Sequence, residues 1–140
     1  MPFVYSQVRS LIDKPLQGDG SCVDLIKMYT PGLRGLTTPN WAPGVAVVGS
    51  TGLTPGTAIA TFENGRYPRR RTGNHAAFFL AYSGAAIWVV DQWPHVSRRT
   101  RVDKRLIHPA RPRPDGTYTD PSNSAGAFSV IELRKCAPSC

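Results

Sequence analysis

Two apolar runs separated by a short turn dominate the middle of the chain. HAAFFLAY begins at His75, and AIWVVDQW begins at Ala86, with Ser83-Gly84 between them. Short runs rich in aromatic and β-branched residues and bounded by turn residues are typical of strands. We therefore expect a β-hairpin here, and with it a sheet in the second half of the molecule.

Helical patterns precede this hairpin. FVYSQVRSLI (3–12) carries apolar residues at a spacing that suits a short amphipathic helix. After Gly18-Asp19-Gly20, Ser21 is a good N-cap and Asp24 follows three residues later, as in a capping box. The second helix should begin next to Cys22 and end before Pro31-Gly32.

The remaining segments complete an α+β fold. Further strands are expected after Pro43-Gly44, in GTAIATF (56–62) and in AFSVIEL (127–133), whereas residues 94–123, rich in arginine, proline and polar side chains, should form a surface excursion with little regular structure. We predict a single domain over residues 1–140, with N-terminal helices packed on a mostly antiparallel sheet of about five strands.

The charge of the chain is strongly positive. Seventeen Lys and Arg residues against nine Asp and Glu give a net charge of +8. Such a surface attracts polyanions or simply aids solubility. Zinc-finger spacing, basic heptads and RNA-binding strand motifs are lacking, so nucleic acid is not the expected partner. No apolar run approaches the ~20 residues of a bilayer-spanning helix, so we expect no stable membrane insertion.

The three cysteines fall into two groups. Cys136 and Cys140 form a C-x3-C pair too isolated from other ligands for a zinc site. They are either a short-range disulfide, which we favour, or two idle thiols. Cys22 lies in the first turn of the second predicted helix, where free N–H groups and the helix dipole favour a thiolate. A cysteine in this place is nevertheless more often structural, so other residues must decide.

A histidine and an acid flank the predicted hairpin. His75 opens the first strand, and Asp91 interrupts the apolar run of the second. Acids are disfavoured inside strands, and a buried one needs a partner. Antiparallel pairing brings the start of one strand beside the end of the next. Cys22, His75 and Asp91 therefore suggest a nucleophile, a general base and an orienting acid, with His95 as the alternative base.

Several separated motifs resemble a known family. G-x-G-x-C-V-x-L-I from Gly18, W-x-P-G from Trp41, G-N-H-A-A from Gly73 and V-V-D-Q-W from Val89 occur in the order seen in papain-like CHAP and NlpC-type peptidoglycan hydrolases. Among these, the chain is most similar to the second family of type VI secretion amidase effectors and their domesticated relatives in ticks.

The resemblance implies a papain-like fold without cofactor or metal, acting on peptidoglycan. It implies cleavage of the D-alanine–meso-diaminopimelate cross-link by a monomer, delivered by the type VI secretion apparatus without a cleaved signal peptide into a target periplasm, and a cognate immunity protein in the producer. Cys22 and His75 match the family's nucleophile and base, and Asp91 the more variable third residue.

Further residues are candidates for oxyanion or substrate binding. Gln17 precedes the nucleophile as the oxyanion glutamine of papain-type sites does, although the backbone N–H of Cys22 is the better donor. Asn74 either bonds substrate or serves a turn. Trp93 is the tryptophan closest to the expected cleft, whereas Trp41 and Trp88 are expected in the core.

Two alternatives to this function stay open. One is a cysteine amidase of the same fold that acts on another isopeptide or acyl substrate. The other is a basic, non-enzymatic module that binds the cell envelope or nucleic acid and whose cysteine is structural.

Overall fold

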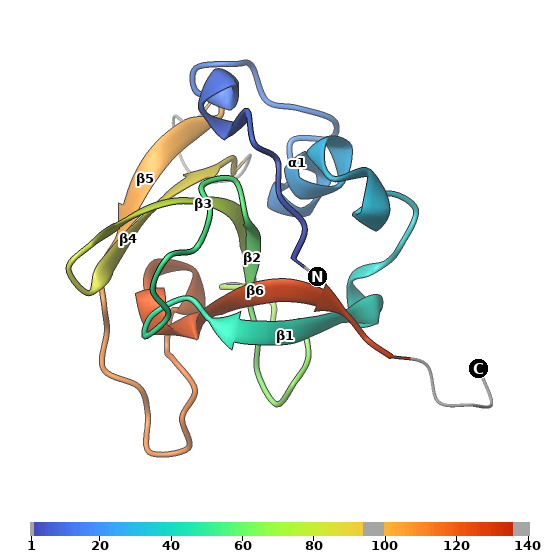
Figure 1. Ribbon diagram of the computed structural model, residues 1–140. Helices are drawn as coiled ribbons and strands as arrows, with labels where there is room; N and C mark the ends of the chain where they lie inside the picture. Colours follow the sequence, from blue (N-terminus) through green and yellow to red (C-terminus); the bar gives the residue numbers. More distant parts are fainter. Residues whose placement is uncertain (1, 94–99, 136–140) are drawn as a thin grey trace.

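The computed structural model describes residues 2–93 and 100–135, which build one six-stranded antiparallel sheet with a helix on it (Figure 1). The strands follow the spatial order β1-β6-β2-β3-β4-β5. The helical elements are the 3-10 turns η1 (Val8–Leu11), η2 (Pro31–Leu33), η3 (Thr38–Asn40), η4 (Pro121–Asn123) and η5 (Ala125–Ala127) and the helix α1 (Cys22–Tyr29). The strands are β1 (Trp41–Ala46), β2 (Ala58–Thr61), β3 (Ala76–Ser83), β4 (Ala86–Asp91), β5 (Asp103–Ile107) and β6 (Phe128–Leu133).

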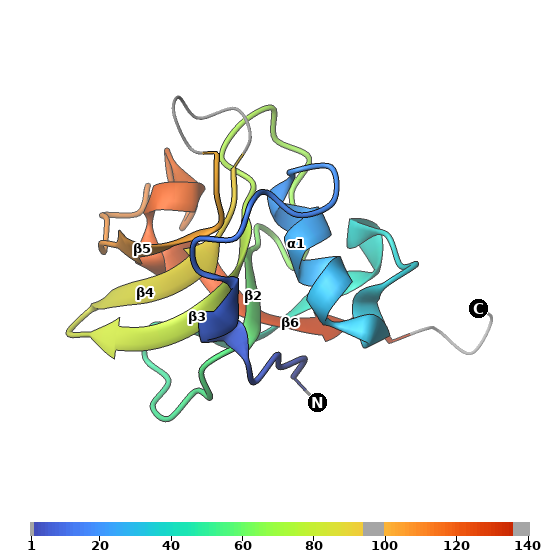
Figure 2. The ribbon, with the colours of Figure 1, turned by 90° about the horizontal axis from the view of Figure 1, so that it is seen from above.

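Both faces of the central strands are covered. In β3, Phe78 packs into the cluster that includes Leu25 and Ile26 of α1, whereas its neighbour Phe79 packs into a second cluster with Phe128. Successive side chains of a strand point to opposite faces of the sheet. Because both faces of β3 are buried, its sequence is a continuous apolar run. Figure 2 shows α1 against one face of the sheet, beside β2 and β3, with β5 at the far edge.

The start of α1 is fixed by local hydrogen bonds. The Ser21 hydroxyl accepts from the Asp24 N–H at 3.1 Å, which confirms the predicted N-cap. The Asp24 carboxylate accepts from the Asp19 N–H at 2.8 Å and thereby closes the preceding loop. Gly18 has a φ of 58°, and a Cβ there would meet the Asp24 carboxylate. The loop and the first helical turn are therefore one rigid unit that positions Cys22.

Two segments differ from the sequence-based expectation. Residues 3–12 do not form an amphipathic α-helix: Val4 bridges Thr57, and only Val8–Leu11 form a 3-10 turn. A helix of this length is marginal in water, and here the backbone bonds instead to the loop before β2. The excursion over 94–123 contains β5, so the sheet has six strands instead of about five.

The predicted hairpin of β3 and β4 is confirmed, with Ser83 paired to Ala86. The strand expected after Pro43-Gly44 begins earlier, at Trp41, and both residues lie inside β1. β1 is an edge strand of the sheet, where proline is tolerated because its missing N–H costs no ladder bond. Among the described residues, no helix is both long and apolar enough to span a bilayer.

Candidate active site

A histidine and a carboxylate meet where β3 begins and β4 ends. His75 Nε2 lies 2.7 Å from Asp91 Oδ2, and both side chains are almost completely buried, at 1% and 0% exposure. The antiparallel register that pairs Phe78 with Val90 brings this end of β3 beside this end of β4. The proximity expected from the hairpin is therefore present.

Three neighbours of the Cys22 sulfur lower the pKa of its thiol. The sulfur interacts with the His75 ring, with the backbone N–H of Ala76 and with the Tyr67 hydroxyl. Because Nε2 of His75 is held by Asp91, the other ring nitrogen, Nδ1, is the atom available to the sulfur. Cys22, His75 and Asp91 thus form one connected series, as the sequence predicts.

The electrostatics of the series favour an ion pair. Burial disfavours the Cys22 thiolate, but the hydrogen bond and positive charge of His75 outweigh it, so the pKa of Cys22 falls below its ordinary value. Burial likewise disfavours imidazolium, yet the bonds to Asp91 and Cys22 raise the pKa of His75 from 6.5 to about 9. Both shifts favour the form of the pair in which Cys22 is a thiolate and His75 an imidazolium.

Tyr67 was not predicted from the sequence. Burial and the negative charge on Cys22 raise the pKa of Tyr67 well above its ordinary value, so its hydroxyl keeps its proton. A protonated hydroxyl can donate to the sulfur anion. The sequence around Tyr67 has no pattern that predicts a functional role, because the residue lies in an irregular loop between Arg66 and Pro68.

Arg105 is a second unpredicted residue. Its Nε donates to Asp91 Oδ2 at 3.0 Å, and its terminal nitrogens donate to Asn123 Oδ1 at 2.6 Å and to the Ser122 carbonyl at 3.0 Å. The β4–β5 register pairs Asp91 with Asp103, which places Arg105 diagonally across on the same face. The guanidinium holds Asp91 in one orientation and favours its charged form.

The secondary candidates are dispersed around this series. Trp93 stacks on the His75 ring with centroids 4.9 Å apart. Asn74 donates to the Arg70 carbonyl at 3.0 Å, and its Oδ1 is buried without a partner in the described part of the chain. Gly73, with a φ of 90°, is the residue in the left-handed region, so Asn74 is not needed for the turn. Substrate contacts by Trp93 and Asn74 remain predictions.

Gln17 is held by its neighbours. Its side-chain nitrogen donates to the Pro15 carbonyl at 2.7 Å, and its side-chain oxygen accepts from the Tyr29 hydroxyl at 2.7 Å. An oxyanion role for this amide remains a prediction, and the first-turn N–H of Cys22, which needs no intrahelical partner, is the simpler donor. His95, Cys136 and Cys140 lie outside the described residues, so the alternative base and the disulfide are not tested.

Comparisons with known proteins identify the relatives of this chain. The family model of domesticated amidase effector 2 matches residues 6–128. A type VI secretion amidase effector 2 protein of Salmonella typhi is 43% identical over 136 residues, which are 94% of this chain and all of that protein. The solved structure of a type 6 secretion amidase effector 2 superposes with a TM-score of 0.86 at 42% identity, covering 95% of this chain and 96% of the other.

The chain belongs to the amidase effector 2 family. The resemblance found in the sequence motifs and the α+β fold expected from it are confirmed. Within the described residues of this amidase effector, no group of three or more His, Cys, Asp or Glu side chains could hold a metal ion.

Gln92, the residue after Asp91, connects the sheet of the effector to the loop over residues 17–21, which precedes Cys22. The fully buried Gln92 accepts from the Gln17 N–H at 2.7 Å and donates to the carbonyls of Gln17 at 2.9 Å and Ser21 at 2.7 Å. Because Asp91 ends β4 and Gln92 follows it directly, the end of β4 orients the acid and anchors the loop before Cys22 at the same time.

Gln92→Ala is expected to destabilise the protein and to loosen the loop over residues 17–21, which precedes Cys22. The substitution removes three hydrogen bonds and leaves the Gln17 N–H without its partner, whereas the carbonyls of Gln17 and Ser21 still accept from the N–H groups of Gly20 and Leu25. The expected cost is about 2 kcal/mol of unfolding free energy. Urea denaturation measures this loss, and kcat/KM should fall with it. Gln7→Ala, at an exposed glutamine, is the matched control and should change stability by less than about 0.5 kcal/mol. Equal stability of the two variants would contradict the anchoring role.

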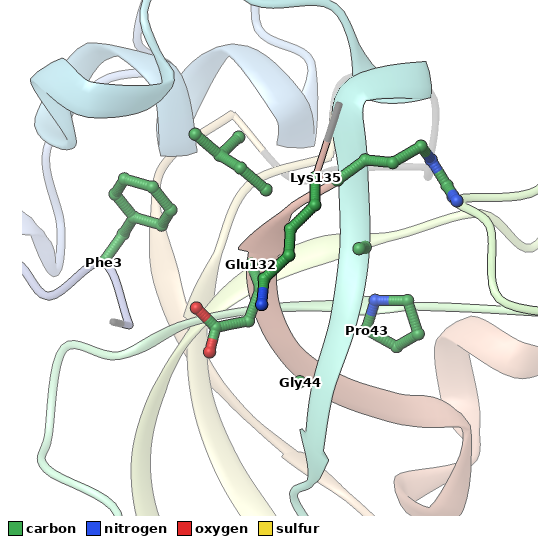
Figure 3. Close-up of a pocket in the computed structure, with 8 residues that line it drawn as sticks. Phe3, Pro43, Gly44, Glu132 and Lys135 are labelled. Atoms are coloured by element: carbon green, nitrogen blue, oxygen red, sulfur yellow. The ribbon is translucent and has the colours of Figure 1, made fainter. Parts of the chain in front are cut away.

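Two pockets of the described structure differ in their relation to the Cys22 series. One of about 880 Å³ lies along β1 and β6 and is lined by residues that include Phe3, Pro43, Glu132 and Lys135 (Figure 3). None of its lining residues belongs to the Cys22 series. A second pocket, of about 400 Å³, has Tyr67 in its wall, the residue whose hydroxyl interacts with the Cys22 thiol.

Proposed function

We propose that this amidase effector is a cysteine endopeptidase that cleaves the peptide cross-link of peptidoglycan between D-alanine and meso-diaminopimelate. The observation that carries the proposal is the series that connects the Cys22 sulfur, the His75 ring and Asp91. The names of its relatives, which are type VI secretion amidase effectors, support the substrate class and an antibacterial role.

The first half of the reaction transfers the acyl group to sulfur. The Cys22 thiolate attacks the carbonyl carbon of the D-alanine residue, and the Cys22 N–H stabilises the oxyanion that forms. His75 then gives its proton to the amide nitrogen, and the carbon–nitrogen bond breaks. The amine of diaminopimelate leaves, and a thioester on Cys22 remains.

The second half returns the enzyme to its starting state. Neutral His75 takes a proton from water, and the resulting hydroxide attacks the thioester carbonyl. The carbon–sulfur bond breaks, which releases a peptide with a free carboxylate and restores the thiolate beside imidazolium. Asp91 keeps Nε2 of His75 occupied throughout, so that Nδ1 faces the sulfur and the substrate.

The setting proposed for this reaction is a competitor's periplasm. The type VI secretion apparatus would deliver the protein as an antibacterial toxin, and a cognate immunity protein would protect the producing cell. The excess of basic residues, +8 overall, suits contact with an anionic cell wall.

Digestion of purified sacculi tests the bond that is cut. We expect cross-linked dimers to disappear and tetrapeptide monomers to accumulate, as muropeptide chromatography with mass spectrometry would show. Tripeptide or dipeptide products would place the cut elsewhere in the stem, and an unchanged profile would contradict peptidoglycan hydrolysis.

A further inference from the structure

The pocket beside Tyr67 carries unused positive charge. Its wall includes Pro39, Glu63, Arg66, Tyr67 and Arg69, and its volume is about 400 Å³. Tyr67 reaches from this pocket to the Cys22 sulfur through its hydroxyl. Tyr67 therefore links the wall of the pocket to the reacting atom.

The only carboxylate in the described wall is already paired. Glu63 Oε1 lies 2.6 Å from Arg70 Nη1, and Arg70 also donates to the carbonyls of Tyr118 and Thr119. The guanidinium groups of Arg66 and Arg69 are exposed and have no hydrogen-bond or ion-pair partner within the described part of the chain. With Glu63 neutralised, the pocket presents two cations, Arg66 and Arg69, that have no partner among residues 2–93 and 100–135.

The pocket is preformed by a tight turn. Glu63 and Arg66 exchange both backbone hydrogen bonds, at 2.9 and 3.0 Å, around Asn64 and Gly65, whose φ values are 52° and 75°. Two consecutive residues with positive φ define a type I′ turn, for which Asn-Gly is the favoured sequence. Arg134 holds the Gly65 carbonyl at 2.7 Å. The backbone that carries Arg66 is therefore fixed before any ligand binds.

The proposed substrate offers a matching group. In the cross-link, the scissile nitrogen is attached to a carbon of diaminopimelate that also bears a free carboxylate. Arginine side chains bind carboxylates through paired, charge-assisted hydrogen bonds. We propose that Arg66 and Arg69 form a subsite for a stem-peptide carboxylate, an inference that rests on the proposed function. This subsite selects substrates in which that carboxylate is free.

Binding to a protein that cannot turn over tests the subsite apart from catalysis. Calorimetry would compare Cys22→Ala with Cys22→Ala/Arg66→Gln/Arg69→Gln, using a purified cross-linked muropeptide dimer. We expect the dissociation constant of the triple variant that lacks both pocket arginines to be about tenfold larger. Amidation of the diaminopimelate carboxylates should weaken binding to Cys22→Ala by a similar factor and should leave the triple variant unaffected.

The matched control removes the same charge elsewhere. Arg9 and Arg111 are exposed and lie outside the pocket, so Cys22→Ala/Arg9→Gln/Arg111→Gln should bind as Cys22→Ala does. Equally weakened binding in both triple variants would show that only net charge matters and would overturn the subsite. The subsite would also be overturned if the muropeptide dimer bound to none of the variants, or if amidation of its carboxylates left binding unchanged. Failure of wild-type protein to cut sacculi, with arginine-dependent binding intact, would overturn the proposed function alone.

Discussion

Cys22→Ala is expected to slow cross-link hydrolysis about 10⁴- to 10⁶-fold, because removal of the nucleophile removes the only covalent route to the product. The residual rate would come from binding and oxyanion stabilisation. Digestion of purified sacculi, followed by chromatography of the released muropeptides, measures the effect. A substitution of sulfur by one hydrogen leaves the backbone of α1 unchanged, so the fold should persist.

Met28→Ala is the matched control for this experiment. It alters a partly exposed side chain near the other end of the same helix and should leave hydrolysis close to the wild-type rate. A Cys22→Ala protein that is folded by circular dichroism and still opens cross-links would refute the thiol mechanism. If Cys22→Ala and Met28→Ala were both inactive, the result would indicate damage to α1. Thermal melting would distinguish such damage from loss of the nucleophile.

The parts of the fold that the sequence predicts correctly are those with a strong local pattern. The hairpin of β3 and β4 follows from two apolar runs with a turn between them, and the start of α1 follows from the Ser21 cap. β5 was missed because Asp103, Lys104 and Arg105 make up most of it. An edge strand has one unpaired side and tolerates charge, so its composition resembles that of a loop.

The same distinction holds at the site. Asp91 stands out because an acid interrupts an apolar run, and His75 because it opens one. Tyr67 and Arg105 carry no such mark: each reaches the site only through the register of the sheet or the path of a loop. Sequence patterns therefore identified the groups proposed to react, whereas the groups that hold them required coordinates.

His75→Ala is expected to lower the reactivity of Cys22 sharply at acidic pH. At pH 6 an ordinary thiol with a pKa of about 8.5 is only ~0.3% thiolate. His75 keeps the pKa of Cys22 below its ordinary value, and without it burial alone would raise that pKa. Alkylation by iodoacetamide at pH 6, followed by mass spectrometry, should therefore slow about 100-fold or more in the variant and recover only above pH 8.5.

His108→Ala, which changes an exposed histidine, should be alkylated like the wild-type protein. Equal labelling of Cys22 in the wild-type and His75→Ala proteins would favour a structural cysteine and the non-enzymatic binding module.

Cross-link hydrolysis and alkylation of Cys22 should also respond differently to high pH. As pH rises through about 9, His75 loses the proton that the leaving amine needs. Hydrolysis should then fall while alkylation continues, because the thiolate persists without its acid.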